Sequence, residues 1–108
     1  MDDITCVEDI RELARRAGNH FFDRDTMSFF RSRILDGLWS GPGGVYFCTS
    51  ERAPNSIRRE YTVREAVVRR DVNPPGFGTN NGGTFTTARQ AKARAKALAA
   101  GAGRLERL

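Results

Sequence analysis

Four of the seven phenylalanines in this 108-residue chain, Phe21, Phe22, Phe29 and Phe30, lie within one ten-residue stretch. The same stretch is interleaved with arginines and aspartates, in the order HFFDRDTMSFFRSRIL from residue 20 to residue 35. Four large apolar side chains need either a core or a partner to cover them. This block therefore constrains the chain to a fold in which a large apolar surface lies beside an arginine-rich one.

The length of the chain allows one hydrophobic core and excludes two. Hydrophobic residues make up 39% of the sequence and charged residues 29%, which is ordinary for a globular protein. We expect a single α+β domain over residues 1–100, with a flexible loop at 71–83 and a frayed basic tail at 101–108. No apolar run is long enough to span a bilayer, and the acidic start MDDITCVEDI is unlike a secretory signal, so a cytoplasmic protein is expected.

Two helices are predicted in the first third of the chain. Thr5 and Glu8 have the spacing of a capping box, and apolar residues then recur on one face, which predicts a helix over 6–17. Asp23 or Asp25 can cap a second helix that runs to about Leu35 and ends near Gly37. Its apolar stripe would be Met27, Phe30, Ile34 and Leu38, with Phe29 on the far side close to Arg33.

Strands are predicted in the middle of the chain. Val45 to Ser50 is β-branched and aromatic, and a second strand runs from Glu60 to Val68. In the second strand Tyr61, Val63 and Val67 share one face, and Thr62 and Arg64 form a charged, solvated face. Residues 71–83, DVNPPGFGTNNGG, are rich in turn formers and predict the long loop, followed by a short strand over 84–86.

A last helix is predicted from a second capping box, Thr87 and Gln90, to about Ala100. Small side chains line one face and suit close docking on the strands: Ala88, Ala91, Ala95, Leu98 and Ala99. The element order is therefore α-α-β-β-β-α. We expect a three-stranded antiparallel sheet with the helices packed on one face.

The net charge of +5 resides entirely in the C-terminal segment. Residues 84–108 contain six Arg or Lys and one Glu, whereas the charges of residues 1–83 cancel. Arg89, Lys92 and Lys96 form one row on the last helix, and Arg58 and Arg59 could reinforce it from the loop before the second strand. Such a row can contact the phosphates of a nucleic acid, or it can simply be a solvated helix face.

No catalytic or metal-binding set is evident. His20 lies near Asp23 and Asp25, but no nucleophile is placed beside it, and a polar residue before a helix is common. Cys6 and Cys48 have no metal-ligand spacing and are expected to be reduced. We therefore expect a non-enzymatic protein without a metal or cofactor.

Two resemblances extend this interpretation. The strand, turn and basic helix opened by TARQAK resemble the end of a double-stranded RNA-binding domain, and the order α-β-β-β-α over about 24–100 matches that family. The Gly-Pro-x-His loop of that family is absent between the first two strands; Gly41-Pro42 precedes the first strand instead. The resemblance implies phosphate contacts from the start of the last helix.

The second resemblance covers nearly the whole chain. Its motifs are FFxxxTMxFFxSR at residues 21–33, YFxTSE at 46–51 and YTVR at 61–64. In these motifs the chain is similar to an uncharacterised family of short bacterial, plasmid and phage proteins. The resemblance implies an accessory protein of a mobile element and lends no catalytic residues.

Three hypotheses of function follow. The first is a non-enzymatic accessory protein that binds a host or phage macromolecule in the host cytoplasm, and the second is nucleic-acid binding through the last helix. The third is a small toxin-like ribonuclease that uses His20, Tyr61 and arginines. The candidate partners are a host or phage protein, or RNA or DNA, and neither a membrane nor a small-molecule cofactor is expected. The candidate binding residues are Phe29, Arg33, Arg58, Arg59, Arg64, Arg89, Lys92 and Lys96.

Overall fold

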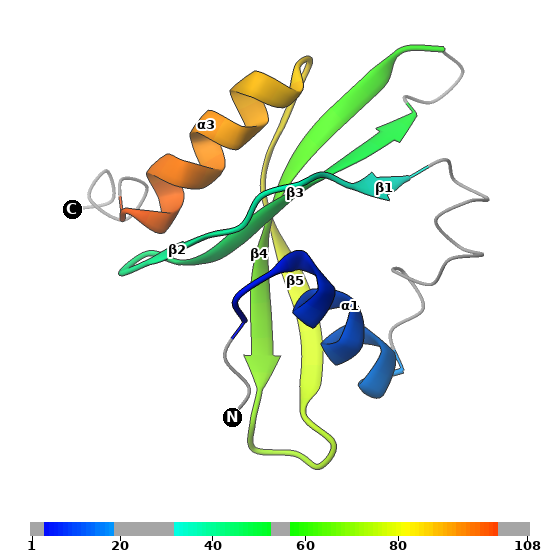
Figure 1. Ribbon diagram of the computed structural model, residues 1–108, viewed down its shortest axis with the longest axis vertical. Coiled ribbons are helices and arrows are strands. Elements are labelled where there is room, and N and C mark those ends of the chain that lie inside the picture. Colours follow the sequence, from blue (N-terminus) through cyan, green and yellow to red (C-terminus); the bar gives the residue numbers. More distant parts are fainter. Residues whose placement is uncertain (1–3, 19–31, 53–56, 102–108) are drawn as a thin grey trace.

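A computed structural model describes residues 4–18, 32–52 and 57–101 of the chain (Figure 1). Its elements, in chain order, are α1 (Val7–Arg16), β1 (Arg33–Ile34), β2 (Trp39–Gly41), β3 (Gly44–Arg52), β4 (Arg59–Arg69), β5 (Gly76–Phe85) and α3 (Ala88–Ala99). The α+β class predicted from the sequence is confirmed. The helix over 6–17, the two central strands and the final helix are also found where the sequence indicated them.

The described strands form one five-stranded antiparallel sheet, where three strands were expected. Its main path is β1-β3-β4-β5, and β2 pairs with the same edge of β3 as β1 does. The longest ladders join β3 to β4 and β4 to β5, so the two central strands hold the sheet together.

The two described helices pack on opposite faces of this sheet. Tyr46 and Cys48 of β3 belong to the core under α3, whereas Phe47, between them, packs against Ile10 and Ala14 of α1. Successive side chains of a strand point to opposite faces, so β3 supplies both cores. The expectation that the helices share one face was therefore wrong. Figure 1 shows α3 and α1 lying well apart against different parts of the strands.

The predicted helix ending near Leu35 is also corrected at its C-terminal end. Arg33 and Ile34 pair with Ser50 and Thr49 as the short strand β1, and residues 23–31 lie outside the described chain. Ile34 and Leu38 do share a core, the one with Phe47. Leu38 lies in the segment between β1 and β2, and positions i and i+4 of an extended chain fall on one side as they do in a helix, which is why the periodicity was ambiguous.

Most of the predicted loop at 71–83 is strand. Residues Gly76–Phe85 form β5, which pairs with β4 along its whole length, from Arg69–Gly76 to Tyr61–Phe85. Glycine and asparagine are uncommon in strands, and they concealed this one. Phe77 and Phe85 fix it, because each packs into one of the two cores.

A bulge interrupts the β4–β5 ladder. Val63 pairs with Gly83 and Arg64 pairs with Asn81, so Gly82 is an additional residue in β5. A Cβ atom at position 82 would lie 3.0 Å from the Val63 side chain and 3.1 Å from that of Leu98. Glycine therefore lets β5 and α3 approach closely at this point.

The face of β4 that was expected to be solvated is largely covered. Thr62 is 5% exposed, and the side chain of Arg64 is 17% exposed. Arg64 donates hydrogen bonds to Thr49 Oγ1 and Glu51 Oε1, each over 2.8 Å. The pairing of a cation with a hydroxyl and a carboxylate allows this partly buried position.

The helix caps differ in part from the capping boxes of the sequence. Cys6 is the N-cap of α1, and the Thr5 backbone N–H and hydroxyl donate to the Asp9 carboxylate. These bonds hold the pKa of Asp9 below its ordinary value. In α3 the predicted cap is present, since the Thr87 hydroxyl accepts from the Gln90 N–H. The Gln90 side chain bonds the hydroxyl of Thr86.

Candidate functional site

The position of α3 is fixed by small residues. Ala91, Ala95 and Ala99 are buried against the sheet, as the predicted stripe required. At the far end of the helix, the Gly43 N–H donates to the Ala99 carbonyl over 2.9 Å. A Cβ atom at Gly43 would overlap the Leu98 carbonyl oxygen. The β2–β3 turn therefore caps the C-terminus of α3 and locks its orientation over the strands.

The basic row lies along one flank of α3. At 100° per residue, Arg89, Lys92 and Lys96 fall within one narrow sector to the side of the alanine stripe. Arg89 and Lys96 are exposed, and Lys92 is half-buried. Within the described chain none of the three forms an ion pair or a side-chain hydrogen bond. No acidic side chain of the described residues therefore neutralises their charges.

Lys92 identifies the side of the helix on which the row lies. Burial raises the pKa of the Cys48 thiol to about 11, and the positive charge of Lys92 opposes that rise. Lys92 is therefore close enough to β3 to act on Cys48.

Because Arg33 is in register with Ser50, its side chain lies on the same face of the sheet as α3. Arg33 is exposed and forms no ion pair within the described residues.

The other predicted arginines have different surroundings. Arg59 donates to Ser50 Oγ over 2.6 Å and to the Ser50 carbonyl over 3.0 Å, so it ties β4 to β3. Arg64 lies on the opposite face from α3, in its bond to Glu51. Arg58 is exposed at the end of the β3–β4 hairpin, next to Ile57, which is 85% exposed. Phe29 lies outside the described residues.

The N-terminus of α3 adds to the positive potential of this side. Its first turn contains no acidic residue, while Arg89 lies in that turn. Unsatisfied N–H groups at a helix N-terminus carry a partial positive charge, which favours anions. The helix end and the adjacent side chain thus have the same sign, and a bound anion would relieve their repulsion.

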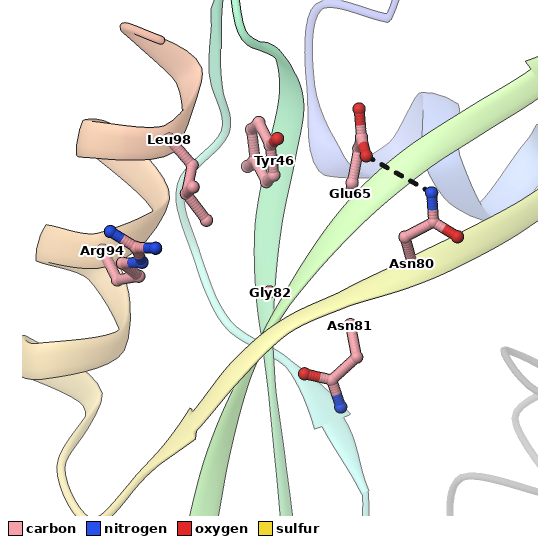
Figure 2. Close-up of a pocket in the computed structure, with 7 residues that line it drawn as sticks. All are labelled: Tyr46, Glu65, Asn80, Asn81, Gly82, Arg94 and Leu98. Atoms are coloured by element: carbon pink, nitrogen blue, oxygen red, sulfur yellow. Dashed lines mark hydrogen bonds between the residues drawn. The ribbon is translucent and has the colours of Figure 1, made fainter. Parts of the chain in front are cut away.

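A cleft opens on the other flank of α3, with a volume of about 400 Å³. Figure 2 shows Arg94 and Leu98 on the helix side and Glu65 and Asn80 on the strand side, with Tyr46 between them. Arg94 falls on the opposite side of α3 from the basic row, so it was not among the binding residues predicted from the sequence. The helical angle of Arg94, at 100° per residue, could have shown that it lies on this flank. The residues across the cleft from Arg94 could not have been predicted, because they depend on the β4–β5 register.

No group of three His, Cys, Asp or Glu side chains that could hold a metal ion occurs among the residues that the structure describes. His20 lies outside those residues, and Tyr61 packs against the core under α3. Neither α1 nor α3 has the length and apolar character needed to cross a membrane.

The fold and the surface define a small α+β protein with a two-faced antiparallel sheet and one helix lined by cations on both flanks. Residues 6–96 match the family model described as a family of unknown function, DUF7447, and the chain belongs to that family. This agrees with the resemblance to an uncharacterised family found in the sequence. No curated protein matches the chain. No solved structure matches it either.

Proposed function

We propose that this protein binds nucleic acid through the basic row of α3, with Arg33 as an additional phosphate contact. The observation that supports the proposal is a difference in ion pairing between the cations of α1 and those of α3. On α1, Arg11 pairs with Glu8, and Arg15 and Arg16 both pair with Glu12. On α3 the corresponding charges have no acidic partner in the described chain, so they remain available to phosphates.

The spacing of the row fits a polyanion. Arg89 and Lys96 are seven residues apart, which at the rise of an α-helix is about 10 Å. Successive base pairs of a duplex rise by about 3.4 Å, so the row spans about three nucleotides along one backbone. A single small anion would engage one of these side chains, whereas a phosphate backbone can engage all three.

The proposal does not extend to duplex RNA in particular. The analogy to a double-stranded RNA-binding domain used a helix over 24–35 followed by three strands. The described part of that region contains β1 instead, and the helices α1 and α3 lie on opposite faces. What supports phosphate binding is the row itself, independent of that analogy.

We also propose the mobile-element setting that the sequence motifs imply, with the bound macromolecule belonging to the host or to the element. The support is the resemblance in the motifs at 21–33, 46–51 and 61–64. A protein partner that uses Phe29 and Arg33 is the alternative. Of these two residues the structure describes Arg33, which is exposed on β1.

The test compares two triple variants that remove equal charge. R89Q/K92Q/K96Q removes the α3 row, and R11Q/R15Q/R16Q removes three paired arginines of α1. Binding to a fluorescent 20-mer, as duplex and as single strand, is measured by anisotropy over a series of salt concentrations. Since each phosphate contact contributes about 0.9 to the slope of log K against log salt on B-DNA, we expect the α3 variant to lose about 2.7 of that slope.

The α1 variant should keep the slope of the wild type, because its arginines are directed to Glu8 and Glu12. Circular dichroism establishes that both variants are folded. Equal losses in the two variants would show that only net charge matters and would contradict the proposed surface. Absence of binding by the wild type at low salt would contradict nucleic-acid binding altogether.

A further inference from the structure

The cleft beside α3 contains two opposite charges that do not meet. Arg94 and Glu65 both line it, yet in the described chain neither forms an ion pair, with the other or with any other residue. Figure 2 places them on opposite sides, with the side chains of Tyr46 and Leu98 between. A direct pair would satisfy both groups, so their separation leaves room for a ligand that is anionic at one end and rich in hydrogen-bond donors at the other.

The acidic side of the cleft is held in place by its neighbours. Asn80 Nδ2 donates to Glu65 Oε1 over 3.4 Å, and the dashed line in Figure 2 marks this bond. On its other side the carboxylate lies over Gly44, where a Cβ atom would come within 2.7 Å of Glu65 Oε2. Glu65 and Asn80 thus lie side by side on adjacent strands, and both line the cleft.

The side chains of Tyr46 and Leu98 lie between the two charged sides of the cleft. Tyr46 is 7% exposed and donates its hydroxyl proton to the Gly43 carbonyl over 3.1 Å, so its ring cannot turn freely. Leu98 packs against the same core. A volume of about 400 Å³ is within the range of small-molecule sites. A flat, partly apolar group with a polar edge is the shape that such a cleft accepts.

We infer that this cleft binds one unstacked guanine nucleotide of a single-stranded nucleic acid, with Glu65 on the base and Arg94 on the phosphate. This inference rests on the proposed function. Sequence-specific recognition of single strands uses the Watson–Crick edges of splayed bases. Guanine presents two adjacent N–H donors on that edge, which match the two oxygens of a carboxylate, whereas adenine and cytosine each present a donor beside an acceptor.

The location of the cleft favours a nucleotide within a chain. The cleft and the basic row lie on the two flanks of one helix, and the ridge between them carries the small residues Ala93 and Ala97. A strand that crosses this ridge can place a base in the cleft and its neighbouring phosphates on Arg89, Lys92 and Lys96. A free amino acid also has an anionic end and a donor end, and it serves as the competing ligand in the test.

The experiment uses three labelled nonamers of uridine whose central residue is guanosine, inosine or adenosine. Inosine keeps the N1–H of guanine and lacks its exocyclic amino group. The wild type is expected to bind the guanosine oligomer about tenfold more tightly than the inosine one, the ratio that corresponds to one charge-assisted hydrogen bond. E65Q should abolish this ratio, and E8Q, which removes an exposed carboxylate of α1, should preserve it.

R94Q should weaken binding of all three oligomers and leave the ratio between them unchanged, because phosphate contacts carry no base information. Free guanosine monophosphate is titrated in parallel. Binding that E65Q abolishes supports the cleft even where the oligomers fail to bind, and so separates this inference from the proposed surface. Equal affinity for the three oligomers, a guanosine preference that survives in E65Q, or tighter binding of a free amino acid than of the nucleotide would overturn the inference.

Discussion

The two described helices differ in how their charged side chains are distributed along the helix axis. Helix α1 begins with Glu8 and Asp9 and ends with Arg15 and Arg16, so its side chains complement the helix dipole at both ends. Helix α3 begins without any acidic residue and carries Arg89 in its first turn. The arginines of α1 therefore find their acidic partners within the same helix. The cations of α3 have no ion-pair partner among the described residues, and the proposed function assigns them to a bound ligand.

The helices also differ in how they pack. Helix α1 buries the large side chains of Ile10 and Leu13, and Phe47 packs against Ile10 from the sheet. Helix α3 uses alanines and lies close to the strands, with Gly43 and Gly82 making room for its backbone and for Leu98. The interface of α1 with the sheet depends on large side chains that fill space, and the interface of α3 depends on small residues that allow a close approach. Opposite kinds of substitution should therefore break them.

The largest effect is expected from truncation on the α1 side. Ile10 is fully buried, so Ile10→Ala removes apolar surface and leaves a cavity beside Phe47. We expect the free energy of unfolding to fall by about 2–5 kcal/mol, measured by urea denaturation. Ile57→Ala is the control, because that side chain is 85% exposed. A loss below about 1 kcal/mol for Ile10→Ala would mean that α1 contributes little to stability.

An intermediate effect is expected from enlargement on the α3 side. Ala95 is fully buried, so Ala95→Leu should force the helix away from the sheet and cost about 1–3 kcal/mol. Ala93→Leu adds the same atoms on the exposed side of the helix and should change stability by less than about 0.5 kcal/mol. Both are measured by the same denaturation method. Equal effects at the two positions would contradict the close docking of α3.

The effect that is smallest at neutral pH, and that grows only at alkaline pH, concerns the thiol of Cys48 between the sheet and α3. Its pKa of about 11 lies above the ordinary value of about 8.5 that it regains on unfolding. The unfolded chain therefore loses this proton first as the pH rises. The stabilisation should be complete below about pH 8.5 and decline towards about pH 11.

The measurement is the free energy of unfolding from pH 7 to pH 11 for the wild type and for Cys48→Ala. The wild type should show the steeper decline, and a parallel decline would place the Cys48 thiol in a more solvated environment. Alkylation followed by mass spectrometry gives a second readout. Cys6 is exposed and should react at neutral pH, whereas Cys48 should stay protected while the protein is folded.

Elements whose signals are local were predictable from the sequence. The alanine stripe and the Thr87 cap of α3 depend on residues within one or two turns, and they were found as expected. The strands around Tyr46 and Val63 follow from β-branched and aromatic composition. The region near Ile34 was misassigned because an i, i+4 pattern suits both a helix and a strand. Only the C-terminal end of β5 was predicted, as the short strand over 84–86. The rest was missed because its long-range pairing with β4 outweighs its glycine-rich composition.

The same distinction applies to the candidate site. The basic row on α3 was predictable because helical geometry fixes the relative positions of Arg89, Lys92 and Lys96. That Arg59 and Arg64 bond Ser50 and Glu51 depends on the β3–β4 register, which no local pattern specifies. The cleft needs the β4–β5 register as well, because it brings Glu65 beside Asn80 and both opposite Arg94.

The bulge at Gly82 lets β5 pack into both hydrophobic cores. Phe77 and Phe85 are eight positions apart, and in a regular strand both rings would project to the same side. Because the surplus glycine reverses the alternation between them, Phe77 joins the core with α1 and Phe85 joins the core with α3. A single residue without a side chain thus lets β5 contribute a phenylalanine to each core, so that this one strand joins the α1 side of the sheet to the α3 side.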